Sequence, residues 1–488
     1  MPPAPPSRGD GDDDGGAAGP SVRATLGTLL ELPRGFRKRT LAALGAGARV
    51  GWHTLRRALP GAAPEGEGRP ADAARDAAAE RTALQLVETL GALKGLALKA
   101  GQMASYIHGA LPPAAQRVLT RLQADTHPMA FAQIDAVVRA ELGASADEVF
   151  EGFERTPFAA ASIGQVHRAL LRTAVDGGAD VLRPVAVKVQ YPGIEDVLHG
   201  DLRLFGGLLK LAFFATPGDG GAVAAELRDR ILEECDYERE ARHQALFRRL
   251  VHAEPLAGRV HADVPEVVAA ASTRRILTSA LVEGARDFYR FATESDQPAR
   301  DRAAADIFAT AFTCIFRHCV YNADPHPGNY LFRPDGTVVF LDFGCVRHFE
   351  AHVVDTWKAC ARAVLDGDRA AYRRGFTALG FVGSPRRFDW DAAWDVMQYL
   401  YAPFLATEPF TYTPEYVERS YDVIVWSNPN ARRMGTPREF LFVNRLQWGL
   451  NSVFAHLRAT GPWGELWRRA LDEPTRPAAL DAGAADRR

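Results

Sequence analysis

The strongest constraint on the fold is a run of polar and turn-forming residues at 321–344. It contains Asp-Pro-His-Pro-Gly-Asn, in which Asp324 stands five residues before Asn329. Two short apolar runs follow, separated by an Asp335-Gly336 pair that signals a tight hairpin. The second apolar run ends in Leu-Asp342-Phe-Gly. A hairpin here would bring Asn329 and Asp342 together.

This spacing is typical of a kinase catalytic loop followed by its metal-binding segment. Phosphoryl transfer needs a group that orients the nucleophile or accepts its proton, and oxygen ligands for Mg²⁺. Asp324 fits the first role. Asn329 and Asp342 fit the second, because hard cations prefer oxygen. The alternative is a chance Asp–Asn pair beside an ordinary hairpin, which the combined spacing disfavours.

Composition sets broad limits. Of 488 residues, 47% are hydrophobic and 24% charged, as expected for a globular protein with a sizeable core. The formal net charge of −2 offers no basic field for nucleic acid. The five scattered cysteines contain no Cys-x-x-Cys pair and indicate reduced thiols. No signal peptide or membrane span is visible, so we expect a cytoplasmic protein, with peripheral membrane contact as the open alternative.

The N-terminal quarter changes character along its length. Residues 1–21 are rich in Pro, Gly and Asp, which predicts a disordered tail. Residues 22–60 mix apolar and basic positions, which predicts amphipathic helices that are either solvated or lie on an anionic membrane. A Pro/Gly-rich linker follows, and residues 71–107 then form a long helical pattern containing Lys99-Ala-Gly-Gln102. Further helices are expected at 113–123 and 131–152.

The next segment predicts the start of a nucleotide site. An Ala-rich stretch, Ala159-Ala160-Ala161-Ser162, occupies the position of a phosphate-binding loop between two strands. After Leu171 a Gly-Gly turn leads to an alternating strand at 184–190. It contains Val-Ala-Val-Lys188, which matches the strand whose lysine holds the α- and β-phosphates in kinases. An isolated edge-strand lysine is the alternative.

A basic residue in that position requires an acidic partner on a nearby helix. Helices are expected at 194–215 and 222–250, and the second contains Glu234-Cys-Asp236-Tyr-Glu-Arg-Glu240. On one continuous helix Glu234 and Glu240 would lie about 120° apart and would serve different partners. A charged surface helix is the alternative.

The remaining elements follow in order. Residues 264–268 and 275–281 predict strands, and the segment ending in Glu283-Gly284 predicts a hinge between lobes. A helix is expected at 299–320, before the catalytic loop. After Gly344 the pattern is mostly helical to about 472.

The ordered set of motifs resembles one family. Lys-x-Gly-Gln, the Ala-rich loop ending in Ser-Ile-Gly-Gln-Val-His, Val-Ala-Val-Lys, Glu-Cys-Asp-Tyr-x-Arg-Glu, Asp-Pro-His-Pro-Gly-Asn and Leu-Asp-Phe-Gly occur in that order. Over about residues 75–480 they are similar to the UbiB/ADCK (AarF) atypical kinases, and most of all to the coenzyme Q branch. The resemblance implies an α+β, bilobal protein-kinase-like fold with an N-terminal helical extension and a mostly helical C-terminal lobe.

The resemblance also implies a domain layout. The expected units are a disordered tail (1–21), an amphipathic segment and linker (22–70), a helical extension (71–155), an N-lobe (156–284), a C-lobe (285–473) and a loose tail (474–488).

The same resemblance implies roles for individual residues. Lys188 would bind phosphate, Glu240 would be its ion-pair partner, and Asp324 would be the catalytic-loop acid, with Asn329 and Asp342 as Mg²⁺ ligands. The helix carrying Lys99 and Gln102 would fold over the active site. The full set of candidate cofactor-binding residues is Ala159, Ala160, Ala161, Ser162, Lys188, Lys99, Gln102, Glu234, Asp236 and Glu283.

Three departures from relatives or from ordinary kinases bear on function. Asn322 replaces the His that often precedes the catalytic Asp in relatives, and we expect it to be structural. Alanines replace the glycines of an ordinary kinase phosphate loop, so their Cβ atoms should limit backbone approach to the phosphates. No Ala-Pro-Glu follows Gly344, which argues against a general protein kinase.

Together these observations favour an enzyme that binds ATP or ADP with Mg²⁺, as an ATPase or a small-molecule or lipid kinase in isoprenoid-quinone or related lipid metabolism. Its candidate partners are a lipid or quinone precursor, a peripheral membrane surface and proteins of a lipid-biosynthetic complex, but not nucleic acid. Two alternatives stay open. One is a regulatory pseudokinase that binds nucleotide without significant phosphoryl transfer, and the other is a phosphotransferase of the aminoglycoside or choline type.

Overall fold

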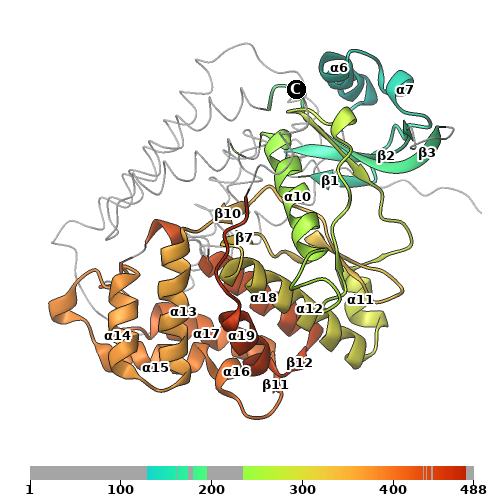
Figure 1. Cartoon of the computed structure of the whole chain (residues 1–488). Coiled ribbons are helices and arrows are strands. Elements are labelled where there is room, and N and C mark those ends of the chain that lie inside the picture. Colours follow the sequence, from blue (N-terminus) through green and yellow to red (C-terminus); the bar gives the residue numbers. More distant parts are fainter. Residues whose placement is uncertain are drawn as a thin grey trace, which may run out of the picture.

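The computed structural model describes residues 129–479, except residues 162, 174–179, 195–232, 234, 432, 436 and 441–442. Figure 1 shows a sheet-bearing region formed by the first part of this range and a helical region formed by the second. The predicted tail at 1–21, the amphipathic segment, the Lys99–Gln102 helix and the helices at 113–123 and 194–215 lie outside the described residues.

The sheet-bearing region is built on four antiparallel strands in the order β1-β2-β3-β5. They are β1 (Ala159–Ala161), β2 (Gly164–Thr173), β3 (Val181–Gln190) and β5 (Ile276–Ala280). Alternate side chains of β3, at Val185, Val187 and Val189, are buried in one apolar cluster. Lys188 therefore projects from the opposite face of the sheet, because successive side chains of a strand alternate.

Two helices pack on the Val185–Val189 face. The sequence predicted a single helix at 131–152, but the structure has α6 (Phe131–Leu142) and α7 (Ala146–Val149). Gly143 breaks the pattern with a left-handed φ of 78°. Ser145 then starts α7 through a capping box with Glu148. The prediction of one continuous helix was therefore wrong.

The helix on the Lys188 side is α10 (Tyr237–Val251). Asp236 precedes it with extended backbone angles, φ −110° and ψ 91°, and its side chain accepts a hydrogen bond from the Arg239 N–H. Asp236 is thus an N-cap. The prediction of one continuous helix over 222–250 was wrong for the described residues, because Asp236 lies outside the helix and α10 begins only at Tyr237.

A second sheet has the order β4-β9-β8-β6. The strands are β4 (Ala262–Asp263), β6 (Arg286–Asp287), β8 (Tyr330–Phe332) and β9 (Val338–Phe340). The hairpin of β8 and β9 is as predicted, and Gly336 in its turn has a φ of 91°.

The strand predicted at 264–268 was misplaced. Within that range only Val267 forms a bridge, which is isolated and pairs with Ser279. Pro265 lacks the N–H that a longer ladder would need.

The helical region surrounds α12 (Gln297–Phe316), which ends before the predicted residue 320 because β7 (Val320–Asn322) begins there and pairs with β10 (Val346–His348). Around it lie α11 (Phe288–Glu294), α13 (Ala351–Leu365), α14 (Arg369–Ala378), α15 (Trp390–Leu400), α16 (Ala402–Leu405), α17 (Pro414–Tyr421), α18 (Val443–Leu457), α19 (Trp463–Asp472) and the strands β11 (Phe410–Thr411) and β12 (Thr460–Gly461). The core is rich in stacked rings, such as Phe404 on Trp467 at 4.5 Å.

The chain after α19 is attached to this lobe. The N–H groups of Arg476 and Ala478 donate to the carbonyls of Arg317 and His318, at 2.6 and 3.0 Å. Those carbonyls follow the last turn of α12, where a helix leaves acceptors unsatisfied. The prediction of a loose tail from Pro474 was therefore wrong for residues 474–479.

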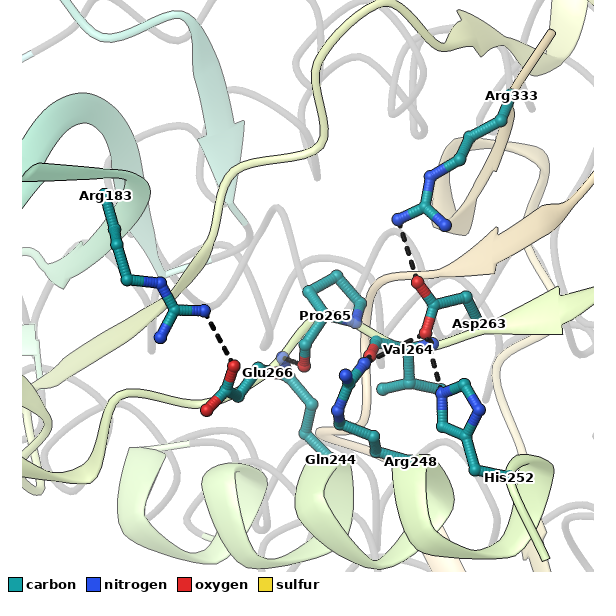
Figure 2. A network of polar contacts seen from close by, with 9 residues as sticks. All are labelled: Arg183, Gln244, Arg248, His252, Asp263, Val264, Pro265, Glu266 and Arg333. Carbon is teal, nitrogen blue, oxygen red and sulfur yellow. Dashed lines mark hydrogen bonds and ion pairs between the residues drawn. The ribbon is translucent and has the colours of Figure 1, made fainter. Parts of the chain in front are cut away.

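A polar network joins α10 to the second sheet (Figure 2). Asp263 of β4 accepts from Arg248 of α10 at 2.9 Å and from His252, the residue after α10, at 3.0 Å. It also accepts from Arg333, which follows β8, at 2.8 Å. Nearby, Gln244 of α10 donates to the Pro265 carbonyl at 2.8 Å. Burial alone would raise the pKa of Asp263, but hydrogen bonds from Arg333 and His252 outweigh it and lower that pKa. Asp263 therefore anchors the C-terminal half of α10 as a carboxylate.

We predict that Asp263→Asn destabilises the protein by about 2 kcal/mol, because hydrogen bonds between charged groups are lost. Urea unfolding at neutral pH measures this. Glu266→Gln is the matched control: Glu266 contacts Arg183 at 2.8 Å with both side chains largely exposed, so the loss should be below about 1 kcal/mol. The contribution of Asp263 is fully present above its unfolded-state pKa of about 4 and disappears as pH falls through its lower folded-state pKa. Equal effects of the two substitutions would contradict this anchor.

Candidate active site

The loop between β7 and β8 folds back on itself. The Asp324 carbonyl accepts hydrogen bonds from the His326 N–H at 2.8 Å and from Asn329 Nδ2 at 2.9 Å. The second bond fixes the orientation of the Asn329 amide. Asn329 Oδ1 has no hydrogen-bond partner in the described part of the chain. Asp324 and Asn329 are thus held in one short, internally bonded loop.

The β8–β9 hairpin places Asp342 beside this loop. The Leu341 N–H donates to the Asn329 carbonyl at 3.0 Å, and Asp342 Oδ1 accepts from the Gly344 N–H at 2.9 Å. Asn322 joins the two halves: its Nδ2 donates to the Asp342 carbonyl at 2.5 Å, and its Oδ1 accepts from the Asp324 N–H at 3.1 Å. A single amide therefore sets the spacing of the two acids.

The other side of the site is an ion pair. Lys188 Nζ lies 2.7 and 2.9 Å from the two carboxylate oxygens of Glu240, and these side chains are only 17% and 5% exposed. Burial by itself would lower the pKa of Lys188, but the charges of Glu240 and Asp342 outweigh it and raise the pKa. The lysine is therefore a cation between two carboxylates. Its ammonium also lies 4.8 Å from the centre of the Tyr237 ring.

The surroundings of Gly344 show how closely the segment with Asp342 approaches Glu240 of α10. A Cβ at this position would lie 3.3 Å from Asp342 Oδ1 and 3.8 Å from Glu240 Oε2. Behind Glu240, one turn further along α10, burial and the charge of Arg239 lower the pKa of His243 to about 4. His243 is thus neutral at neutral pH and adds no positive charge behind the ion pair.

Sequence reasoning missed Arg445 on α18. Its Nη2 lies 2.6 Å from Asp324 Oδ1, with the two side chains 10% and 19% exposed. On the same helix Gly449 packs on the catalytic loop: a Cβ there would lie 2.5 Å from Pro325 Cγ. The only signal in the sequence is an arginine beside the apolar positions of an amphipathic helix, more than a hundred residues after Asp324.

The Ala-rich stretch differs in part from expectation. Ala159–Ala161 form strand β1 rather than a loop, because they pair with the start of β2 in a tight hairpin, with Ala161 opposite Gly164. Ala159 and Ala160 are exposed and Ala161 is half-buried. Ser162 lies outside the described residues.

The other candidate residues are less informative. Asp236 caps α10, and its backbone is continuous with the helix that carries Glu240. Glu283 is exposed in the connection between β5 and β6, beside Gly284 with its φ of 68°. Lys99, Gln102 and Glu234 lie outside the described residues. Within the described ranges no cluster of three or more His, Cys, Asp or Glu side chains could hold a metal ion by itself.

This arrangement defines a kinase-like protein. A small antiparallel sheet carries Lys188, which pairs with Glu240 on α10, and a helical lobe carries Asp324, Asn329 and Asp342 at its edge. Residues 121–374 match the model of the ABC1 atypical kinase-like domain. Because this match covers more than half of the chain, the chain belongs to the ABC1 atypical kinase-like family.

Curated relatives agree with this family. Over 384 residues the chain is 29% identical to the mitochondrial atypical kinase COQ8B of Danio rerio, covering 78% of this chain and 59% of that protein. Over 294 residues it is 30% identical to the mitochondrial atypical kinase COQ8 of Saccharomyces cerevisiae, covering 59% of this chain and 56% of that protein. The chain thus spans a little over half the length of these relatives. These matches agree with the expected coenzyme Q branch.

A solved structure is also similar. It is the Rv3197–erythromycin complex from Mycobacterium tuberculosis, with a TM-score of 0.59 and 28% identity, covering 83% of this chain and all of that one. The expected α+β kinase-like fold is therefore confirmed. No helix within the described residues is long and apolar enough to cross a membrane.

We predict that Glu240→Gln destabilises the protein by about 3 kcal/mol, because it leaves the buried Lys188 ammonium with less compensating charge. The double variant Lys188→Met/Glu240→Leu should recover most of this loss, since it removes both charges. Urea unfolding without nucleotide measures both. A double variant that is less stable than Glu240→Gln would show that the pair is not coupled as described.

We predict that Gly449→Ala destabilises the protein, although a Gly→Ala change in a helix usually stabilises it. In a helix interior this change normally stabilises by about 1 kcal/mol. Here the methyl group would meet Pro325, so we expect a loss of about 1–3 kcal/mol from overpacking. Ser452→Ala on the same helix is the control and should stay within about 0.5 kcal/mol. A stabilised Gly449→Ala protein would mean that α18 does not pack tightly on the catalytic loop.

Proposed function

We propose that the chain is an Mg-ATP-binding atypical kinase-like enzyme, acting as an ATPase or as a small-molecule or lipid kinase in isoprenoid-quinone or related lipid metabolism. The observation that carries the proposal is the buried Lys188–Glu240 pair, with Asp342 near enough for its charge to raise the pKa of the lysine. Asp342 follows the hairpin that also positions Asn329. In kinases this combination brings a phosphate-binding lysine next to the metal-binding acid.

The residues present fit Mg²⁺ and nucleotide phosphates. Asp342 supplies a carboxylate, and the Asn329 amide is oriented by the Asp324 carbonyl so that Nδ2 is used and Oδ1 remains as the acceptor. Mg²⁺ is commonly bound by one or two protein oxygens together with phosphates and water, so a larger protein cluster is not required. Asn329 and Asp342 would hold the ion, and Lys188 would bind the phosphates. The bound Mg²⁺ would neutralise charge on the transferring phosphate.

Asp324 would orient the hydroxyl of the acceptor. The acceptor class is supported by two observations. The sequence after Gly344 has no Ala-Pro-Glu segment for peptide docking. The related proteins named COQ8 and COQ8B are atypical kinases of the mitochondrion, and the coenzyme Q connection supports a lipid or quinone precursor as partner.

One observation favours a second candidate, a nucleotide-binding regulator without significant phosphoryl transfer. Arg445 engages the carboxylate of Asp324 at 2.6 Å, and an acid held in this way is less available to an acceptor. The two functions differ in turnover. If Asp324→Asn reduces ATP hydrolysis by the full chain while leaving nucleotide affinity unchanged, the enzyme is supported, whereas hydrolysis equal to that of wild type favours the regulator.

We predict that Mg-ATP raises the melting temperature of the wild-type protein. A ligand at 100 times its Kd stabilises by about 2.7 kcal/mol. Asp342→Asn should remove the Mg²⁺-dependent part of the shift, because a carboxylate ligand becomes an amide. Asp335→Asn, in the exposed turn of the same hairpin, is the matched control and should behave like wild type. An equal ATP shift in EDTA and in Mg²⁺ would contradict the metal assignment.

A further inference from the structure

The C-terminal lobe contains a large cavity that the proposed nucleotide site does not use. Its volume is about 400 Å³, and it lies among α12, α13, α14, α15, α18 and α19. Close-packed protein cores contain few voids larger than a water molecule. Small-molecule sites typically measure about 300–1,000 Å³. The cavity is therefore of ligand size rather than a packing defect.

The walls of the cavity select for a neutral, apolar occupant. Aromatic and aliphatic side chains dominate, including Phe308, Trp357 and Tyr401. None of the described side chains that line it is charged. A charged group would lose its hydration here without gaining a partner, which is strongly unfavourable.

One part of the wall is polar and unpaired. Gln447 and Asn451 stand four residues apart on α18, so they lie on the same face of the helix, and both line the cavity. Neither side-chain amide has a hydrogen-bond partner in the described part of the chain, although Asn451 is only 8% exposed. Asn430, also in the wall, differs: its amide bonds the backbone of Asp389 at 2.6 and 2.8 Å. Asn451 is buried and Gln447 is half-buried. Buried amides are normally satisfied, so Asn451 above all has hydrogen-bonding capacity for a ligand.

We propose that this cavity binds a neutral lipid that has one long alkyl or prenyl chain and a single hydroxyl or carbonyl group at its end. The chain lies among the aromatic side chains, and the polar end is held by Gln447 and Asn451. The amides can both donate and accept, so they suit either group.

The position of the cavity connects it to the catalytic loop. Leu446 and Leu450 of α18 line this cavity and also the small void of about 30 Å³ next to Asp324. Arg445, adjacent to Leu446, contacts Asp324. The lipid thus rests on the helix that positions the catalytic acid, while its binding requires neither nucleotide nor metal.

The experiment uses tryptophan quenching in the full chain, in EDTA and without nucleotide, so that its result does not depend on the proposed nucleotide site. Trp357 and Trp467 line the cavity, and bromine quenches an indole that it touches. The probe is ω-bromoundecanol, kept below the concentration at which it aggregates. We expect saturable partial quenching that undecanol reverses. Absence of saturable quenching overturns the proposal, and this is also the result if another part of the chain fills the cavity.

Variants test the polar end. Asn451→Leu keeps the number and branching of the side-chain heavy atoms but removes the amide, so affinity for ω-bromoundecanol should fall about tenfold, the worth of one hydrogen bond, while affinity for bromoundecane stays the same. Ser452→Ala, the next residue on α18, should bind both probes like wild type. Val396→Phe, which adds volume inside the cavity, should weaken both probes. If Asn451→Leu leaves the affinity for the alcohol unchanged, the assignment of the polar end is wrong, and unaltered binding to Val396→Phe places the probe elsewhere.

Discussion

The ion pair of Lys188 and Glu240 exists only if α10 is held against the sheet. Two opposite charges that are 17% and 5% exposed have lost most of their hydration, and close geometry must compensate for that loss. The position of α10 is secured at both ends. Asp236 caps its first turn, and Asp263 binds Arg248 and His252 toward its last turn. Because Asp263 also binds Arg333 next to the β8–β9 hairpin, the helix carrying Glu240 and the hairpin leading to Asp342 share one anchor.

The helical lobe positions the other half of the site through α18. Gly449 permits close contact with Pro325, and Arg445 holds the carboxylate of Asp324. The same helix presents Gln447 and Asn451 to the large cavity on its other side. One helix thus lies between a polar loop and an apolar cavity. A shift of α18 would alter both the catalytic loop and the cavity, because close-packed interiors transmit displacements.

Much of the site follows from local sequence patterns. Val-Ala-Val-Lys188 predicted its strand through alternation, and Asp335-Gly336 predicted the hairpin that brings Asn329 near Asp342. These predictions depend on neighbours within a few residues, whose conformational preferences are strong. Among the local predictions that failed were the helices continued through Gly143 and Asp236. Gly143, in a left-handed conformation, ends α6, and Asp236 caps the start of α10. The spacing of apolar residues does not reveal such cap residues.

The sequence by itself determined the family, the kinase-like order of elements and the acids of the catalytic loop. Each of these depends on motifs whose residues are close together in the sequence. The motifs by themselves left the acidic partner of Lys188 open, the family resemblance pointed to Glu240, and the structure shows that pair across 52 residues. Only the tertiary structure decided that Asp263 anchors α10 and that Arg445 contacts Asp324. It also decided that an apolar cavity remains among helices whose sequences read as ordinary core. The physical reason is that ion pairs and voids depend on the distances between elements, and those distances are set by packing rather than by the residues adjacent in the chain.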